Sequence, residues 1–156
     1  MSLITQTDLE NRLKLAEVVR FSGGTGTTPN AARVTDAIAK AENRMRSEII
    51  KVFTAASWDA LTAATCPDVA KIHLVSDAAD LLSSGNERAQ EIEDKALEAR
   101  LFRIRIAKNE ERCFDSVLTL IGSGTGNDTV RITAPTSRVM DYTDTQSAII
   151  SRDPPL

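Results

Sequence analysis

The sequence predicts a mostly α-helical protein, a small bundle of about four helices with an extended C-terminal arm that can add short β-strands. Two observations predict this fold class. Through most of residues 1–114, apolar residues recur at three- and four-residue spacing, which places them on one face of a helix. After Asp115 this pattern gives way to a Gly- and Thr-rich stretch with scattered apolar residues. We therefore divide the chain into a helical body, residues 1–114, and an arm, residues 115–156.

The first helix is expected to begin after Thr5, because Thr5 and Asp8 have the spacing of a capping box. Leu9 and Leu13 lie on its apolar face, and the helix is expected to end at Ser22. The run SGGTGTTP follows. Its glycines permit positive φ angles and its proline cannot continue a helix from upstream, so we expect a flexible connection.

The second helix has the clearest apolar face in the chain, and Asn30 is its expected cap. We expect this face in the core, although an interface between chains would need the same pattern. A looser stretch follows at residues 53–65, where Ser57 is the expected cap of a short helical turn and Trp58 is expected to cover the edge of the core. The apolar face of the second helix consists of Val34, Ile38, Ala41, Met45, Ile49 and Val52.

Two further helices complete the predicted bundle. The third is expected to have Pro67 as its first residue, where the missing amide costs nothing, and to stop at Gly85. Its predicted buried stripe is Val69, Ile72, Val75, Ala79 and Leu82. Asn86 is the expected cap of the fourth helix, whose inward residues are Ala89, Ile92, Ala96, Ala99 and Ile106. The first half of this helix is acidic and the later half is basic, which complements the helix dipole.

The arm is expected to act through contacts with another molecule. Its apolar residues are too thinly spread to bury much surface among themselves, so it must stay disordered or pack on a neighbouring body. Two β-prone pieces, residues 117–121 and 129–133, make a hairpin or strand addition possible. The expected apolar anchors are Val130, Ile132, Val139, Met140 and Tyr142, with Arg131 and Arg138 as directional pairing partners.

The composition and the absence of known motifs disfavour several classes of function. A net charge of -3 disfavours a general polyanion binder. Neither a secretory signal nor an apolar run long enough for a membrane is present, so we expect a soluble protein made in the cytoplasm. The glycine clusters at residues 23–26 and 122–126 lack the spacing of phosphate-binding loops. We expect no metal and no cofactor.

Catalysis is also disfavoured. Cys66 and Cys113 lack the paired spacing of a zinc or redox motif, and His73, the single histidine, sits at the edge of a predicted helix stripe. A hydrolase built on Cys66 and His73 is conceivable, but no third orienting group is suggested by position. We therefore expect that the protein is not an enzyme.

Several segments resemble the small head-to-tail adaptor proteins of Mu-like tailed phages and prophages. These segments are ITQTDLENRL with the following AEVVRF, the Gly-rich loop, AARVTDAIAKAENRMRSEI, CPDVAKIHLVSDAADLL and IEDKALEARL. The resemblance runs from about Leu3 to Phe114, and SRVMDY in the arm is similar to the C-terminal segments of that family. The first loop departs from the family pattern, since it has Ser, Gly and Thr where relatives often carry Asp and Gly. The end of the second helix also lacks the tyrosines common in relatives.

The resemblance implies a mostly helical structural virion protein without enzymatic activity. Such a subunit forms a ring, commonly twelvefold, between the portal and the tail, where it closes the filled capsid. The implied partners are further copies of the chain, the portal protein and a tail-completion or tail-terminator protein. DNA would pass through the ring without specific binding, and the location would be the neck of the virion.

One alternative comes from a different class. A small helical regulatory or DNA-associated protein would use the basic end of the fourth helix for recognition. Its support in the sequence is the cluster of Arg100, Arg103, Arg105 and Lys108. A steep salt dependence of DNA affinity would favour this alternative.

Overall fold

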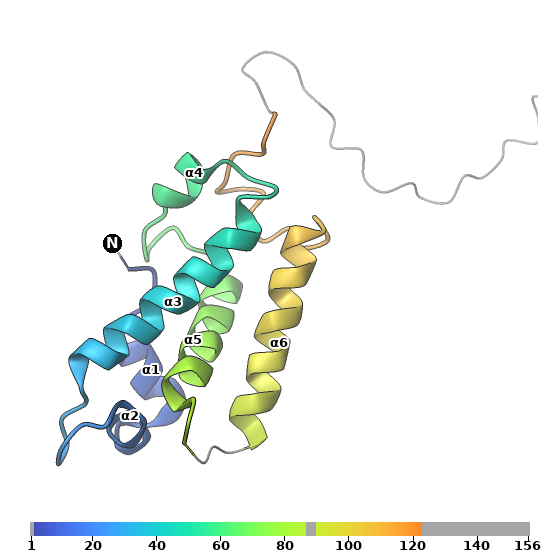
Figure 1. The fold of residues 1–156 in the computed structure, drawn as a ribbon. Helices are drawn as coiled ribbons and strands as arrows, with labels where there is room; N and C mark the ends of the chain where they lie inside the picture. Colours follow the sequence, from blue (N-terminus) through green and yellow to red (C-terminus); the bar gives the residue numbers. More distant parts are fainter. Residues whose placement is uncertain (1, 87–89, 123–156) are drawn as a thin grey trace, which may run out of the picture. The chain divides into compact units, whose positions relative to one another are not determined.

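The computed structural model describes residues 2–86 and 90–122. Among these residues there are six helices and no strand, so the mostly helical fold class is confirmed (Figure 1). The helices are α1 Gln6–Leu13, α2 Leu15–Ser22, α3 Ala31–Ile49, α4 Ala55–Asp59, α5 Asp68–Ser83 and α6 Gln90–Ala107. The chain divides into two units, Met1–Ser123 and Gly124–Leu156, and the second unit lies outside the described residues.

The predicted first helix is in fact two helices, α1 and α2. α1 begins as expected, since the Thr5 backbone amide donates to Asp8 Oδ2 at 2.7 Å and the Asp8 amide donates to Thr5 Oγ1 at 3.3 Å. The helix breaks at Lys14, which has φ 67° and ψ 148°. Each helical residue turns by about 100°, so Val18 would face away from Leu9 in one continuous helix. The break allows both residues to be fully buried.

The glycine-rich connection between α2 and α3 forms a defined turn, where the sequence suggested a flexible segment. The amide of Thr25 donates to the carbonyl of Thr28 at 3.1 Å, and the amide of Thr28 donates back to Thr25 at 3.0 Å. Gly24 is required for this close approach, because a Cβ atom at its position would lie 2.1 Å from the Thr28 carbonyl oxygen. Ser22 Oγ, itself buried, accepts from the Asn30 amide at 2.9 Å.

The predictions for α3 and the stretch after it are largely confirmed. Asn30 caps α3 by accepting from the Arg33 amide, and the predicted face is buried from Val34 to Ile49. α4 follows, but its cap is Thr54, which accepts from the Ser57 amide, and not Ser57 as expected. Trp58 of α4 is 6% exposed and covers the edge of the core as predicted.

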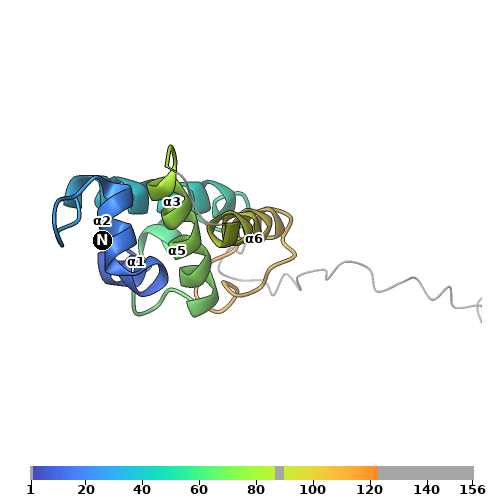
Figure 2. The ribbon, with the colours of Figure 1, turned by 90° about the horizontal axis from the view of Figure 1, so that it is seen from below.

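α5 lies in the middle of the bundle, between α1 and α6, and also packs on α3 (Figure 2). Pro67 is the N-cap residue, so α5 begins at Asp68, one residue later than predicted. The predicted stripe is wrong for its first two members, because Val69 is 48% exposed and Ile72 is 62% exposed. Ala70 and Leu74 take the inward positions instead. The second half of α5 is buried on nearly every side, and four helices, α1, α2, α3 and α6, pack on α5.

α6 runs back beside α5 and also packs on α3 (Figure 1). Ile92, Ala99 and Ile106 are buried as predicted, and Phe102 joins them. Ala96 is half-buried, and Ala89 lies outside the described residues. α5 ends as expected before Gly85, which has φ +86°, a conformation that favours glycine.

The helical body extends beyond residue 114. Phe114 is fully buried, with its ring edge-on to those of Phe53 and Trp58 at 6.4 and 6.2 Å between centroids, and Leu118 is 7% exposed. The amide of Thr54 donates to the Thr119 carbonyl at 2.8 Å. The β-prone piece at residues 117–121 forms a single antiparallel bridge, between Phe53 and Leu120. Residues 115–122 therefore belong to the same compact unit as the helices, Met1–Ser123, although the sequence analysis assigned them to the arm.

Candidate interaction surface

The interface residues predicted from the sequence lie outside the described part of the chain. They are Val130, Arg131, Ile132, Arg138, Val139, Met140 and Tyr142, and all belong to the unit Gly124–Leu156. Their role stays a prediction. A candidate site must therefore be sought on the surface of the body.

The clearest candidate is an apolar stripe on the outer face of α6, made of Leu97, Leu101 and Ile104. Their exposed fractions are 55%, 51% and 40%. The spacing of four and then three residues places the three side chains on one helix face, opposite the buried face of Ile92 and Ala99. α6 packs on α5 and α3 with its other side (Figure 2), and the exposed fractions show that the described residues leave much of this outer stripe open to solvent. Such an exposed stripe is typical of a contact surface.

Charged residues continue the line of the stripe at both ends. Asp94 precedes Leu97 by three residues, and Lys108 follows Ile104 by four. Asp94 Oδ1 accepts a hydrogen bond from Gln90 Nε2 at 3.0 Å within α6. The stripe is therefore acidic at its N-terminal end and basic at its C-terminal end.

The basic cluster of α6 does not form one continuous outward patch. Arg103 is turned inward and pairs with Asp77 of α5; the side chains are 13% and 2% exposed. Burial lowers the pKa of Arg103 from its ordinary value, and the nearby charge of Arg44 acts in the same direction. Arg105 lies 4.0 Å from Glu111 Oε2. Of the cluster named in the sequence analysis, Arg100, Arg105 and Lys108 remain exposed.

His73 packs as a structural residue. Its ring stacks on Phe102 with 4.1 Å between ring centroids and joins α5 to α6. Burial lowers the pKa of His73, and the positive charge of Arg105 lowers it further, while Glu98 and Glu111 oppose the shift. The imidazole is therefore neutral at pH 7.

Neither cysteine has the environment of an activated thiol. Burial raises the pKa of Cys66 to about 11 and that of Cys113 to about 12, so both are protonated at neutral pH. Cys66 Sγ lies 3.8 Å from the Pro67 carbonyl oxygen, to which it donates. The thiolate that a hydrolase built on Cys66 and His73 would need is thus disfavoured.

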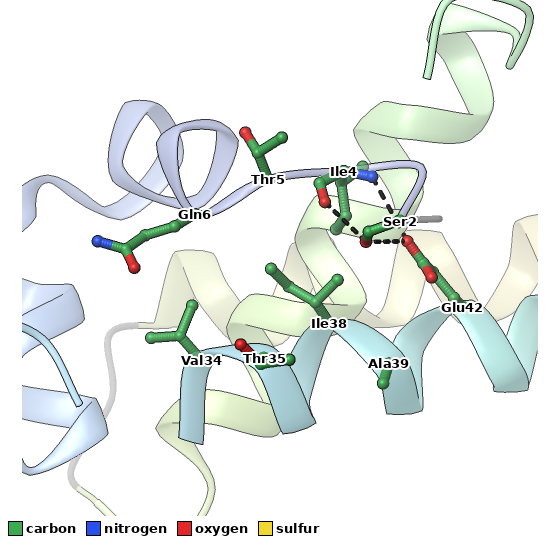
Figure 3. A pocket seen from close by; sticks show the side chains of 9 residues that line it. All are labelled: Ser2, Ile4, Thr5, Gln6, Val34, Thr35, Ile38, Ala39 and Glu42. Carbon is green, nitrogen blue, oxygen red and sulfur yellow. Dashed lines mark hydrogen bonds between the residues drawn. The ribbon is translucent and has the colours of Figure 1, made fainter. Parts of the chain in front are cut away.

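A hollow of about 400 Å³ lies between the N-terminal segment and α3 (Figure 3). Glu42 of α3 holds that segment in place: its Oε1 accepts from Ser2 Oγ and from the Leu3 amide, both at 2.6 Å. The walls are mostly aliphatic, from Ile4, Val34 and Ile38. The polar groups that line the hollow are hydroxyls, an amide and one carboxylate that already accepts these bonds, so no proton-transfer pair faces it.

A second hollow, of about 360 Å³, lies between α1 and α5. Its apolar members are Ile72 and Val75, and its charged lining residues are of both signs: Asp8, Arg12, Asp68 and Lys71. Arg12 Nη1 also pairs with Glu91 Oε1 of α6 at 3.0 Å, and Lys71 pairs with Asp68 at 3.3 Å. These pairings balance the charge, so the hollow has no strong preference for a charged ligand.

Within residues 2–86 and 90–122, no group of three or more His, Cys, Asp or Glu side chains is arranged to hold a metal ion. In the same part of the chain, no helix combines the length and the apolar character needed to cross a membrane.

Comparison of the chain with protein-family models, with curated proteins and with solved structures found no match.

The α6 stripe was missed by the sequence reasoning, although the signal was present. Leu97, Leu101 and Ile104 have the same three- and four-residue spacing as the buried face of the helix. Two apolar faces on one helix indicate that one face is used for a contact outside the bundle, unless the helix is buried all round.

Proposed function

We propose that this chain is a structural protein of tailed-phage virions, a head-to-tail adaptor subunit that forms a ring between the portal and the tail and closes the filled capsid. Its partners would be further copies of itself, the portal protein and a tail-completion or tail-terminator protein. The sequence resemblance over residues 3–114 supports this class. The mostly helical body agrees with the fold that the resemblance implies.

The observation that carries the proposal is the exposed stripe of Leu97, Leu101 and Ile104. An adaptor acts by surface contacts, and an apolar row on an outer helix is the kind of feature that such contacts use. The states of the two cysteines and the histidine also favour a structural role over catalysis. Cys66 and Cys113 are protonated by burial, and His73 is held against Phe102.

The test is removal of the chain from the phage or prophage that encodes it. Lysates should then contain DNA-filled heads and separate tails, and addition of the purified protein should join them into infectious particles. Electron micrographs and plaque counts measure both steps. Tailed, infectious particles formed without the chain would contradict the proposal.

The DNA-associated alternative has weaker support. It needs the basic end of α6, but Arg103 is paired with Asp77 in the interior and Arg105 lies beside Glu111. A DNA-binding surface would have to rely on Arg100 and Lys108 with these acidic neighbours close by. Electrophoretic mobility shifts at low salt would detect such binding, with a steep loss of affinity as salt rises.

A further inference from the structure

The outer stripe of α6 has a charge pattern that matches its own copy in one orientation only. Asp94 lies at one end of the apolar row and Lys108 at the other, and Leu101 lies midway between them. If two α6 helices pack antiparallel, each Asp94 meets the Lys108 of the other copy. If they pack parallel, Asp94 meets Asp94 and Lys108 meets Lys108, which is repulsive.

We propose that the free protein forms a two-fold symmetric dimer in which the Leu97, Leu101 and Ile104 stripes of two copies pack antiparallel. The row from Asp94 to Lys108 follows a spacing of three, four, three and four residues, which is the spacing of a helix-pairing seam. The three leucine and isoleucine side chains leave water on pairing, and the end charges fix the orientation. The inference concerns the free chain, and it uses the same stripe that supports the proposed adaptor function.

The position of α6 permits this contact. The helix lies at the side of the bundle, with α5 and α3 packed on its inner face (Figure 2). The neighbouring charges near the two ends are consistent with the antiparallel orientation, because Glu91 and Glu93 lie near the acidic end and Arg105 near the basic end, while Arg100 lies beside the midpoint. Two copies related by a two-fold axis use the same patch twice, so the contact closes on itself as a dimer and does not continue into a chain.

Sedimentation equilibrium of the full-length protein tests the dimer. The wild type is expected to self-associate with a dissociation constant tighter than about 1 mM. Leu101→Glu should weaken association at least about tenfold, because it places two carboxylates near the two-fold axis. Ile72→Glu is the matched control: Ile72 is 62% exposed on α5, away from the stripe, and its substitution should leave the dissociation constant unchanged. Circular dichroism confirms that each variant keeps its helices.

Charge reversal tests the orientation. Asp94→Lys alone and Lys108→Glu alone should each remain monomeric, because both end contacts become repulsive in the homodimer. An equimolar mixture of the two variants should form a heterodimer, and the double variant Asp94→Lys with Lys108→Glu should recover the homodimer. Loss of association in both single variants, followed by recovery in the double variant, separates antiparallel from parallel packing, since parallel copies place like charges together in the wild type and in all three variants.

Three results would overturn the inference. The first is a wild type that stays monomeric up to about 1 mM, which would assign the stripe to another part of this chain or to a different protein. The second is a Leu101→Glu variant that associates as tightly as the wild type. The third is a wild-type dimer whose double charge variant stays monomeric.

Discussion

Asp77 and Arg103 join α5 to α6 through an ion pair in the interior. Their side chains are 2% and 13% exposed, whereas the Arg46 and Asp59 pair on the surface has side chains 36% and 55% exposed. A buried charge is stable only while its partner is present, because the low-dielectric interior disfavours an isolated charge. This pair is therefore expected to matter more for stability than the exposed pairs of the body.

Asp77→Asn should lower the free energy of unfolding by about 3 kcal/mol, since it leaves the Arg103 guanidinium buried without a counter-charge. Asp59→Asn is the matched control, and its effect should be much smaller because water screens the exposed pair. Urea denaturation of both variants measures the difference. Equal losses in the two variants would show that the Asp77–Arg103 pair does not stabilise the packing of α5 on α6.

His73 predicts a pH dependence of stability. Burial lowers its pKa in the folded state, so on acidification the unfolded chain binds a proton before the native state does. The free energy of unfolding should therefore fall as the pH drops from about 7.5 to about 5.5, through the usual histidine pKa. His73→Phe keeps an aromatic ring on Phe102 and removes the titrating group. Its stability should fall less over this range in urea titrations; an equal fall would assign the effect to other groups.

At the scale of the element, the break between α1 and α2 depends on an unusual backbone. Lys14 has φ 67° and ψ 148°, a conformation that strains any residue with a Cβ atom. Lys14→Gly should relieve this strain. Glycine also raises the entropy of the unfolded chain, so the net gain in the free energy of unfolding is expected to be about 1 kcal/mol.

Asn109 provides the control for this prediction. Its φ of 61° is also positive, but asparagine tolerates the left-handed region. Asn109→Gly should therefore change stability little. Thermal melts of both variants measure the effect, and a Lys14→Gly variant less stable than the wild type would contradict the assignment of strain at this break.

In the segment after Phe114, two adjacent residues are expected to differ in their contribution to stability. Leu118 is 7% exposed and belongs to the core, whereas Val117 is 38% exposed. Leu118→Ala should lower the free energy of unfolding by about 2–4 kcal/mol, and Val117→Ala by less than about 1 kcal/mol. Chemical denaturation measures both. Similar small effects would mean that residues 115–122 do not belong to the folded body.

Much of the element structure could be predicted from the sequence, and the failures have physical causes. The capping box at Thr5 and Asp8 and the long face of α3 act locally, so their patterns are readable. The sequence does not indicate the break at Lys14, because the residues on both sides of it favour a helix. The break is needed only so that α1 and α2 can both bury their apolar residues in one core. Val69 and Ile72 were placed inside because the pattern of α5 shows apolar residues on several faces, and packing alone decides which face is covered.

At the scale of the whole molecule, a helical body with an uncovered stripe on α6 suits a protein that works by contact. The sequence placed the contact residues in the arm, and those positions lie outside the described residues. The α6 stripe could have been found from its spacing, but exposure is a property of the assembled bundle. α6 is an edge helix only because α5 takes the central place between α1 and α6 (Figure 2).

The proposed adaptor function is tested most directly by electron microscopy of the purified chain mixed with the portal protein that the proposal names as its partner. We expect a second ring of density stacked on one face of the portal, present only when the chain is added. Portal alone serves as the control. Portal particles that remain unchanged at saturating concentrations of the folded chain would contradict the central claim that this protein acts as a ring-forming connector subunit.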